Sequence, residues 1–431
     1  MNKTVAFNTL GCKLNFAESS QIYSFFKEKG FKLVPFSQNA DFYVINTCTV
    51  TSNANKKSRN AIQRAISKNN NAIIIVTGCY TQTGMEELKK IDGIDYIFGA
   101  NDKEEIKKII DHALKFDSPV IKTTEHNEMK TFFPAVSQDD RTRTFLKIQD
   151  GCDYFCSYCT IPYARGRSRN MSIKNVLQKI EEEVEKGTKE IILTGVNIGD
   201  FGKSTSENFY NLLKAIVKQN KIPRLRIGSL EPDLLNEDII KLVADSEIIM
   251  PHFHIPLQSG DNELLKIMNR KYTTEIFKNR IDNIRKHLTD AFIGIDLIVG
   301  MNGETDEIFQ RSYDFIKSID ISYIHYFQYS ERKNTPALNF TPKISSQIKN
   351  ERAKLINQLC KEKNKRFLEK NIGKTQKVLF ESKKKNDIIF GFTENYIRVS
   401  APFKPDLINK IITVRLTGFD FDNDCMNSEL L

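Results

Sequence analysis

Cysteines at the ends of β-rich runs constrain the fold of the first 116 residues most strongly. The runs VAFNTLGC, FYVINTC and IIIVTGC end in Cys12, Cys48 and Cys79. Helical patterns separate these runs, and such alternation predicts a parallel sheet flanked by helices. The carboxyl ends of parallel strands meet at one edge, where open α/β sheets bind their ligands. Three thiols that are distant in sequence are therefore expected to share one site.

The N-terminal domain is expected to contain four strands and four helices. The strands are Val5 to Asn8, Phe42 to Asn46, Ile73 to Thr77 and Tyr96 to Phe98, and the helices lie near Ala17 to Lys29, Asn53 to Lys68, Met85 to Lys90 and Lys103 to Lys115. Residues 117–141 carry Pro119 and Pro134 among polar residues without a clean period. That composition indicates an interdomain linker.

A second α/β domain is predicted between residues 140 and 345. Its six candidate strands are Phe145 to Gln149, Glu190 to Gly195, Arg224 to Ser229, His252 to Leu257, Phe292 to Val299 and Ser322 to Tyr329. The helix after the first strand has Ser172 as a plausible N-cap, with Val176 and Ile180 on one face. Six β/α units are too few for the usual closed barrel of eight. We therefore predict an open partial (β/α)6 barrel.

The C-terminal part is predicted to be a long helix followed by a small β-barrel. The helix runs from about Ser346 to Asn371, and the strands are Lys377 to Glu381, Ile388 to Phe392, Tyr396 to Ser400 and Ile411 to Leu416. Closely spaced short strands favour a barrel, a shape that often binds RNA. The α/β chain is thus divided into residues 1–120, 140–345, 346–371 and 372–431.

Positive charge is concentrated in that C-terminal part. The chain has 64 Lys and Arg against 54 Asp and Glu, a net charge of +10. Residues 343–385 contain 14 basic and four acidic residues, so their excess equals that of the whole chain. Such an excess favours a polyanionic partner such as nucleic acid. Lys383, Lys384 and Lys385 are candidates for RNA contact, although a lysine run is often only a solvated surface.

A second group of cysteines lies in the loop GCDYFCSYCTIPYARG, directly after the first strand of the second domain. Three thiolates from Cys152, Cys156 and Cys159 can hold three irons of a [4Fe-4S] cluster and leave the fourth iron without a protein ligand. A structural zinc site is the alternative, but it needs a fourth Cys or His, and none lies near this loop. We therefore expect a cluster with one open iron.

The N-terminal cysteines have a stronger ordinary explanation, because isolated cysteines are usually small buried hydrophobes. Two of them are preceded directly by glycine, Gly11 and Gly78. A missing side chain lets a bulky ligand approach the backbone. Together with the strand-end positions, this favours a second three-cysteine cluster on Cys12, Cys48 and Cys79.

Other features bear on location and on the remaining side chains. No apolar stretch reaches the roughly 18 residues of a membrane span, and no secretory signal opens the chain, so we expect a cytoplasmic protein without disulfides. Cys360 shares a helix face with Ile356 and is expected to pack, whereas Cys425 has no assigned role. His252 and His254 alternate on one strand, as proton carriers or, more commonly, as hydrogen-bonded core residues.

The cysteine loop, with Tyr158 before its last cysteine, resembles the signature of the radical SAM superfamily. The segments TLGCKLN, INTCTVT, TGCYTQ, HIPLQSGDNELLKIMNRKYT and DLIVGMNGETDE extend the resemblance to the radical SAM methylthiotransferases. In that family an N-terminal cysteine domain precedes the radical SAM domain and a C-terminal RNA-binding TRAM domain. GKTQKVLFE and GFTENYIRV fit a TRAM-like domain, and the rest of residues 373–431 is divergent.

The resemblance implies two [4Fe-4S] clusters and S-adenosylmethionine (SAM). The N-terminal cluster would carry sulfur that one SAM methylates, and a second SAM on the other cluster would yield the radical that activates a substrate carbon. A flavodoxin or ferredoxin would supply electrons, and the sulfur donor is unassigned. No side chain is assigned a catalytic role.

Residues that follow the second-domain strands are the expected SAM contacts. They are Thr194, Gly195 and Asn197 after the second strand, Gln258 and Ser259 after the fourth, and Gly300 after the fifth. The TGVN segment lies where the superfamily has a turn that recognises the methionine amino group. A glycine after a strand also serves a simple turn, so each residue alone is a weak signal.

The family has three branches that differ in substrate. Lys13 in GCKLN resembles the branch that modifies N6-threonylcarbamoyladenosine beside the tRNA anticodon, and INTCTVT and TENYIRVSAP favour the same branch. We therefore expect methylthiolation at carbon 2 of that nucleoside, at adenosine 37. The alternatives are isopentenyladenosine in tRNA, an aspartate of a ribosomal protein, or, in another class, a non-catalytic iron–sulfur protein that binds tRNA.

Three arginines, Arg165, Arg167 and Arg169, follow the cluster loop directly. They could meet RNA, SAM or a carboxylate. Arg165 and Arg167 are taken as RNA contacts together with the lysines at 383–385.

Overall fold

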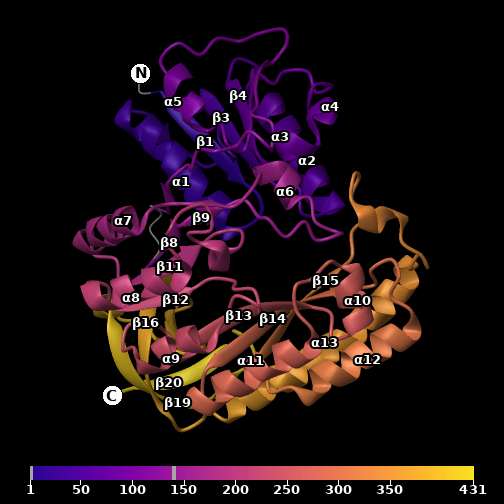
Figure 1. Cartoon of the computed structure of the whole chain (residues 1–431). Coiled ribbons are helices and arrows are strands. Elements are labelled where there is room, and N and C mark those ends of the chain that lie inside the picture. The colour runs from indigo at the N-terminus through magenta and orange to yellow at the C-terminus, as the bar shows by residue number, and fades with distance from the viewer. Residues whose placement is uncertain (1–2, 138–141) are drawn as a thin grey trace.

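The computed structural model describes residues 3–137 and 142–431, apart from the side chain of Lys383, so the predicted RNA contact of that lysine lies outside the described residues. Three parts are visible in Figure 1: an N-terminal domain, a central domain, and a C-terminal β-barrel reached through a long helix. In the part of the chain that is described, no helix is long and apolar enough to cross a membrane.

The N-terminal domain is a parallel sheet of six strands in the order β2-β1-β3-β4-β5-β6. The strands are β1 Thr4–Thr9, β2 Lys32–Leu33, β3 Phe42–Thr47, β4 Ile73–Gly78, β5 Tyr96–Phe98 and β6 Val120–Lys122. The helices are α1 Lys13–Glu28, α2 Ser52–Lys68, α3 Cys79–Thr83, α4 Met85–Leu88 and α5 Glu104–Ile109. The four predicted strands are confirmed. The linker prediction was wrong at β6, because this short exposed strand completes the sheet edge beside β5.

Every residue of β3 and β4 is buried, because helices cover both faces of this sheet. One apolar cluster packs α1 and α5 on one face, and a second packs α2 on the other. Apolar runs such as FYVIN and IIIV therefore predict central strands better than an alternating pattern would.

The central domain is the predicted open (β/α)6 barrel. Its six parallel strands are β8 Arg143–Lys147, β11 Glu190–Thr194, β12 Arg224–Ile227, β13 His252–Gln258, β14 Phe292–Val299 and β15 Tyr323–Gln328. They form two sheets, β12-β11-β8-β7 and β13-β14-β15. Two isolated bridges, Leu225 with Ile249 and Ser229 with His254, join β12 to the chain around β13. The extra strand β7 Ala135–Val136 pairs antiparallel with β8, so the predicted linker contributes to this sheet too.

Helices cover the outside of this barrel (Figure 1). They are α7 Ile173–Glu185, α8 Phe209–Gln219, α9 Glu237–Asp245, α10 Asn262–Ile267, α11 Thr274–His287 and α12 Asp306–Ser318, with short elements β9 Gln149–Asp150, α6 Ile161–Arg165 and β10 Arg169–Asn170 near the cysteine loop and 3-10 turns at Ile198–Asp200 and Pro336–Asn339. The predicted N-cap is confirmed, because the Ser172 side chain accepts a hydrogen bond from the backbone of Asn175.

The C-terminal part begins with α13 Ser346–Glu369, which packs along β15 and α12. Ile356 and Cys360 lie on its buried face, which confirms the packing role of that cysteine. A closed barrel follows in the order β16-β17-β18-β20-β19. Its strands are β16 Thr375–Lys385, β17 Ile388–Thr393, β18 Arg398–Pro402, β19 Ile411–Asp420 and β20 Cys425–Leu430, with a 3-10 turn at Pro405–Leu407. The sequence did not predict β20, whose buried residue Cys425 has a packing role in the barrel.

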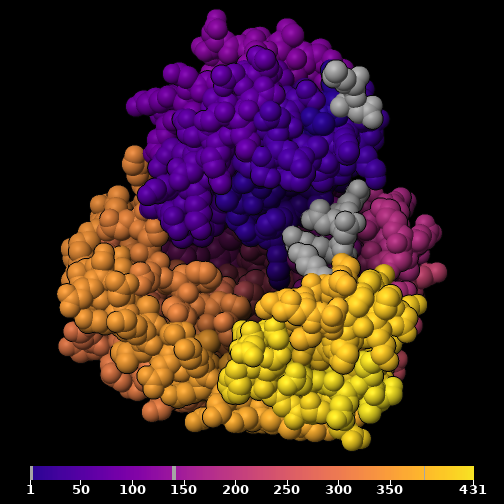
Figure 2. Space-filling view, turned by 180° about the vertical axis from the view of Figure 1, so that it is seen from behind, coloured from indigo at the N-terminus to yellow at the C-terminus, as the bar shows by residue number. Residues whose placement is uncertain are grey.

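The three parts meet around a hollow. Figure 2 shows this hollow between the N-terminal domain, the segment around α13 and the C-terminal barrel. A cavity of about 490 Å³ is lined by residues of all three parts, among them Cys12, Thr194 and Tyr396. The carboxyl ends of the strands of both α/β domains therefore face a shared space.

Candidate active site

The first cysteine set lies at the carboxyl edge of the N-terminal sheet. Cys12 is the N-cap of α1, Cys48 follows β3, and Cys79 opens α3. The loop that carries Cys12 lies against Cys48, since a Cβ added to Gly11 would lie 2.9 Å from the Cys48 Sγ. Burial, together with the neighbouring thiolates of Cys79 and Cys12, raises the pKa of Cys48 to about 11.

The glycines before these cysteines have a structural reason that differs from the predicted one. Gly78 has a φ of +101°, and a Cβ there would lie 2.6 Å from the backbone nitrogen of Thr47 and would also overlap the Thr47 carbonyl. Its missing side chain makes room for the neighbouring strand β3. The sharp turn from β4 into Cys79 therefore needs glycine for packing, before any ligand is considered.

The second cysteine set lies on the loop between β9 and α6. Burial raises the pKa of all three thiols. The other thiolates of the loop contribute to the rise for Cys152 and for Cys159, whose pKa reaches about 12. Arg270 donates a hydrogen bond to the Cys156 Sγ at 3.1 Å, and the backbone N–H of Ile161 donates to the Cys159 Sγ at 3.4 Å. Donors aimed at sulfur favour the thiolate form that binds metals.

The sulfur atoms of each cysteine set are soft ligands of the kind that an iron–sulfur cluster takes. All the cysteines among the described residues are free thiols. Over residues 3–137 and 142–431, no three His, Cys, Asp or Glu side chains converge on a single metal position. A cubic cluster takes one thiol for each of three irons, so three separated thiolates fit it without converging on one ion.

Arg165 connects the two cysteine sets. It ends α6, the single-turn helix that begins just after Cys159, and its Nε donates to the Cys79 Sγ at 3.1 Å. The rest of its guanidinium donates to Glu18 of α1 at 2.9 Å and to Asp150 of β9 at 2.9 Å. Arg165 is 1% exposed, so the prediction that it contacts RNA was wrong. Its guanidinium is buried and paired with two carboxylates.

A buried network of charges surrounds this arginine. The carboxylate of Glu18 also binds Lys147 at 2.7 Å and Lys103 at 3.2 Å. Burial would raise the pKa of Glu18, but Arg165, Lys103 and Lys147 outweigh it and hold the pKa well below its usual range. Members from both domains satisfy one another, which fixes how the two domains dock.

The other arginines of this segment have carboxylate partners as well. Arg169 is buried and donates to Asp150 at 3.3 Å, whereas Arg167 is 72% exposed and lies 3.4 Å from Asp153. Of the three, only Arg167 keeps a side chain that RNA could reach. Its RNA contact stays a prediction.

The predicted SAM residues lie around two cavities. Thr194 and Gly195 line the cavity of about 490 Å³ beside Cys12. Gln258 lines a second cavity of about 220 Å³ together with Cys159, Val50 and Thr51. Each cavity thus has walls from a strand end of the central domain and from a cysteine loop of the N-terminal domain.

The turn after β11 is held by Gln149, a buried residue of β9. The Gln149 Oε1 accepts hydrogen bonds from the backbone of Val196 and Asn197, both at 2.9 Å. Both polar atoms of the Asn197 side chain are buried and have no hydrogen-bond partner among the described residues. Such an orphaned amide calls for an explanation, and a bound ligand with its own donors and acceptors supplies one.

The remaining predicted SAM residues are engaged in local turns. The Ser259 side chain is buried and accepts from the backbone of Asp261 at 3.2 Å. Gly300 has a φ of +74°, and its N–H donates to the Glu304 carboxylate at 2.7 Å. The backbone of Gly300 therefore forms a simple turn, the alternative that the sequence left open.

The two histidines of β13, His252 and His254, line the cavity of about 490 Å³. His254 hydrogen-bonds Asp296 at 2.9 Å, and His252 stacks against Phe292 with ring centroids 5.3 Å apart. Burial, followed by the nearby charges of Arg226 and Lys13, holds the pKa of His252 well below 6.5. His252 is therefore neutral at physiological pH. His254 is hydrogen-bonded, as the sequence favoured over a role as proton carrier.

Comparison with known proteins identifies the family. A model described as "Uncharacterized protein family UPF0004" matches residues 4–99, and one described as the radical SAM superfamily matches residues 146–316. A protein named threonylcarbamoyladenosine tRNA methylthiotransferase MtaB, from Bacillus subtilis (strain 168), is 39% identical over 425 residues, 96% of this chain and 93% of that protein. The chain belongs to the radical SAM methylthiotransferase family. The resemblance seen in the sequence is thereby confirmed.

Other members of the family are similar over nearly the full length. The MtaB protein of Aquifex aeolicus (strain VF5) is 37% identical over 92% of this chain and 96% of its own. A tRNA-2-methylthio-N(6)-dimethylallyladenosine synthase of Clostridium tetani is 32% identical over 96% of this chain and 94% of its own. Two of the three substrate branches are thus represented among the relatives of this methylthiotransferase.

Solved structures support the fold. The radical S-adenosylmethionine methyltransferase TsrM of Kitasatospora setae has a TM-score of 0.57 at 16% identity, covering 78% of this chain and 75% of that one. The cobalamin-dependent radical enzyme OxsB has a TM-score of 0.51 at 14% identity, covering 85% of this chain and 56% of that one. At these identities the likeness concerns the fold alone.

Several side chains that organise the site of this methylthiotransferase were not predicted from its sequence. They are Glu18, Lys103, Lys147, Gln149, Asp150 and Arg270, all buried. Only Arg270 lay in a recognised segment, NRKYT, where a buried arginine carries no local signal. A charged residue inside a helix or strand becomes informative only when its burial is known.

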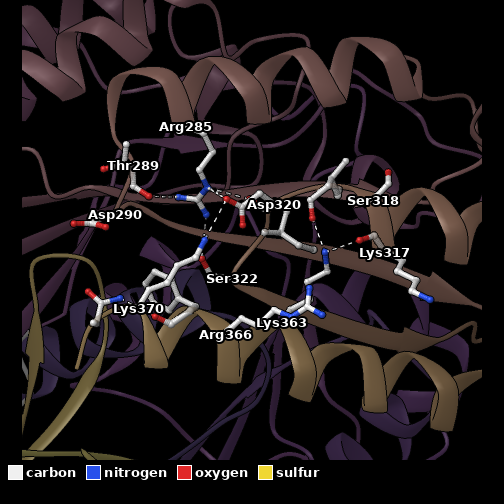
Figure 3. A pocket seen from close by; sticks show the side chains of 14 residues that line it. Arg285, Thr289, Asp290, Lys317, Ser318, Asp320, Ser322, Lys363, Arg366 and Lys370 are labelled. Atoms are coloured by element: carbon white, nitrogen blue, oxygen red, sulfur yellow. Dashed lines mark hydrogen bonds and ion pairs between the residues drawn. The ribbon is translucent and has the colours of Figure 1, made fainter. Parts of the chain in front are cut away.

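A pocket of about 380 Å³ lies at the opposite, amino end of strands β14 and β15 (Figure 3). It is lined by basic side chains, several of which are paired within the pocket. Lys363 donates to the carbonyls of Lys317 and Ile319, and Arg285 binds Asp320 at 3.1 Å. No cysteine lines this pocket, so it is separate from the candidate active site.

Proposed function

We propose that this methylthiotransferase converts N6-threonylcarbamoyladenosine at position 37 of tRNA to its 2-methylthio derivative. The observation that carries the proposal is the meeting of two three-thiol sets at facing strand ends, with Arg165 touching one set from the helix that begins at the other. Identities of 37–39% over nearly the whole chain to proteins named for this substrate support the branch.

In the proposal, Cys12, Cys48 and Cys79 hold one [4Fe-4S] cluster, and Cys152, Cys156 and Cys159 hold the other. Thr194, Gly195 and Asn197 bind SAM from the turn that Gln149 holds, and Gln258 contributes from the second cavity, beside Cys159. When bound, the clusters and SAM would supply the carbon-centred radical and the methylated sulfur. The residues of this chain keep the two sets at a fixed separation and enclose the space between them.

The partners follow from this chemistry. The substrate is tRNA, and a flavodoxin or ferredoxin supplies electrons, because two three-thiol clusters have no internal source of reductant. The sulfur donor is left unassigned.

Turnover by the reconstituted enzyme under anaerobic conditions tests the substrate. Transfer RNA with the threonylcarbamoyl group, the same tRNA without it, and tRNA with isopentenyladenosine are incubated with SAM and reductant, and nucleosides are measured by mass spectrometry. We expect the methylthio product only from the first. A product from the isopentenyl substrate instead would select the branch of the Clostridium tetani relative, and product only on an aspartate of a ribosomal protein would select the third.

The class of protein is tested by SAM cleavage. A reduced methylthiotransferase releases 5′-deoxyadenosine even without substrate, whereas an iron–sulfur protein that only binds tRNA releases none.

The iron count tests the two cysteine sets separately. Replacement of Cys12, Cys48 and Cys79 by alanine together should lower bound iron from about eight to about four atoms per chain. Replacement of buried Cys360, which packs between α13 and β15, is the matched control and should leave iron unchanged. An unchanged iron count in the triple variant would contradict the first cluster.

Two lysines of the C-terminal barrel that are predicted to contact RNA lie beside acidic residues. Lys384 and Lys385 are exposed, but Lys385 contacts Asn423 at 3.2 Å, in a loop that also carries Asp420, Asp422 and Asp424. If both lysines contact phosphates, replacing them by alanine should reduce the slope of log affinity against log salt by about 1.4–1.8. An unchanged slope would remove them from the interface.

A further inference from the structure

The cavity of about 490 Å³ has an unbalanced charge. Its lining includes two basic residues, Lys13 and Arg226, and none of the described residues that line it is Asp or Glu. The remainder of its wall is mostly apolar or small, from residues such as Leu14, Phe145 and Ile192. A space of this kind favours a ligand that is largely uncharged but carries one anionic group.

Arg226 is already committed to the protein. Its Nε binds Glu190 at 2.8 Å, and its two terminal nitrogens donate to the carbonyls of Thr393 and Glu394 at 2.7 and 2.9 Å. The two terminal nitrogens therefore hold the C-terminal barrel on β12, and Nε is paired with Glu190 of β11. Arg226 has little capacity left for a ligand.

Lys13 is in the opposite situation. It is exposed to the cavity, its Nζ lies 5.6 Å from the centre of the Phe145 ring, and it forms no ion pair with any carboxylate among the described residues. It is the first residue of α1, whose N-terminus has no side-chain cap, so the positive end of the helix adds to its charge. Its neighbour Cys12 places it at the edge of the first cysteine set.

We infer that Lys13 binds the carboxylate of the threonyl group of the substrate and thereby selects the threonylcarbamoyl branch of substrates. The inference rests on the proposed function and adds the residue that recognises the threonylcarbamoyl substituent. A threonylcarbamoyl group ends in an amino-acid carboxylate, whereas a dimethylallyl group is a hydrocarbon. A hydrocarbon in the same place would desolvate the ammonium group without a partner, so one side chain both attracts one substrate and disfavours the other.

The test compares RNAs that differ only in that carboxylate. Three anticodon stem-loops carry threonylcarbamoyladenosine, its neutral methyl ester, or unmodified adenosine at position 37. Their dissociation constants for the anaerobically reconstituted full chain are measured by fluorescence anisotropy at one fixed salt concentration, because phosphate contacts make affinity depend on salt.

The wild-type protein should bind the acid at least about tenfold more tightly than the ester, the size expected for a charged hydrogen bond. Lys13→Met should lose this preference, binding the acid about tenfold more weakly and the ester and unmodified RNA unchanged. Lys13→Arg should restore most of it. Lys214→Met is the matched control, since Lys214 also lies over an aromatic ring, Tyr210 at 5.5 Å, on the outer helix α8. This control should keep the full preference.

The outcomes separate the inference from the proposed function. If wild-type enzyme methylthiolates threonylcarbamoyladenosine but Lys13→Met keeps the preference for acid over ester, the inference is wrong and the function stands. Equal weakening of all three RNAs in Lys13→Met would also overturn it, because it would make Lys13 a phosphate contact. If wild-type enzyme turns over only isopentenyladenosine, the proposed function fails first and the inference with it.

Discussion

At the scale of single residues, buried charged side chains fix how the two α/β domains dock. Arg165 donates to a thiol and to two carboxylates while fully enclosed. Such an ion network costs desolvation and is stable only when every member is paired. A pattern of positive residues after a cysteine loop suggested RNA, but the carboxylates that bind the buried Arg165 and Arg169 come from α1 and β9.

Removal of this arginine should therefore be severe. Arg165→Met leaves Glu18 and Asp150 buried with one cation fewer, and we expect the free energy of unfolding in urea to fall by about 3–5 kcal/mol. Arg167→Met is the matched control, because Arg167 is exposed and its ion pair with Asp153 is worth at most about 1 kcal/mol. Equal midpoints for the two variants would contradict a structural role for the network.

The same variant should have a characteristic pH dependence. Burial alone would raise the pKa of Glu18 and Asp150, but the surrounding cations outweigh it and lower both. A carboxylate with a lowered folded pKa stabilises the fold above its unfolded pKa, and this contribution is lost as pH falls through the folded pKa. The stability gap between wild type and Arg165→Met should be widest near pH 7 and narrow below about pH 4. Urea unfolding at several pH values measures it, and a gap that widens in acid would refute the assignment.

At the scale of elements, the turns between strands and cysteines decide where the thiols lie. Gly78 links β4 to Cys79 with a φ of +101° and lies against the backbone of Thr47. Glycine adopts this conformation at little cost, whereas an L side chain is strained in it. The short helix α6 has a similar role on the other side, since it begins two residues after Cys159 and ends at Arg165.

Gly78→Ala should disturb the first cysteine set through this turn. Strain and the overlap with β3 should destabilise the protein by at least about 1–2 kcal/mol and lower the iron bound by Cys12, Cys48 and Cys79. Gly418→Ala is the control, because a Cβ at Gly418 meets no atom within 4 Å. Iron per chain after anaerobic reconstitution and the urea midpoint are the measurements. Full iron with an unshifted midpoint in Gly78→Ala would show that the turn tolerates a side chain.

At the scale of the whole molecule, arginines of the central barrel hold the C-terminal barrel in place. Arg224 on β12 is buried and donates to the carbonyls of Phe392 and Lys377 at 3.0 and 2.7 Å. Burial lowers the pKa of its guanidinium to about 10. Because Tyr396 of the docked barrel lines the shared cavity, this docking also completes the wall opposite Cys12.

Arg224→Met should loosen that docking. Each buried carbonyl that loses its donor costs about 1–3 kcal/mol, so we expect faster hydrogen exchange across β16 and β17 and faster proteolysis near the end of α13. Arg415→Met is the control, because Arg415 is exposed on β19, away from the contact with β12. Unchanged exchange rates in Arg224→Met would mean that other contacts suffice to hold the barrel.

The local pattern of the sequence was enough for the order of strands and helices, the open barrel and the position of both cysteine sets. Hydrophobic period and turn residues act over a few positions, and strand ends of a parallel sheet meet at one edge by geometry. Local pattern was not enough for β2, β6, β7, β10 and β20, which are short or irregular strands that pair because neighbouring strands offer free edges.

The partners of the charged residues could be identified only from the tertiary structure. Arg165, Glu18 and Lys147 look like surface residues in sequence, and they become a buried network only when α1 docks on β8 and β9. Lys13 carried a branch signal in sequence, yet its place opposite the committed Arg226 follows from the meeting of three domains. The physical reason is range: secondary structure depends on neighbours in the chain, whereas desolvation and charge pairing depend on groups that the fold brings together from far apart.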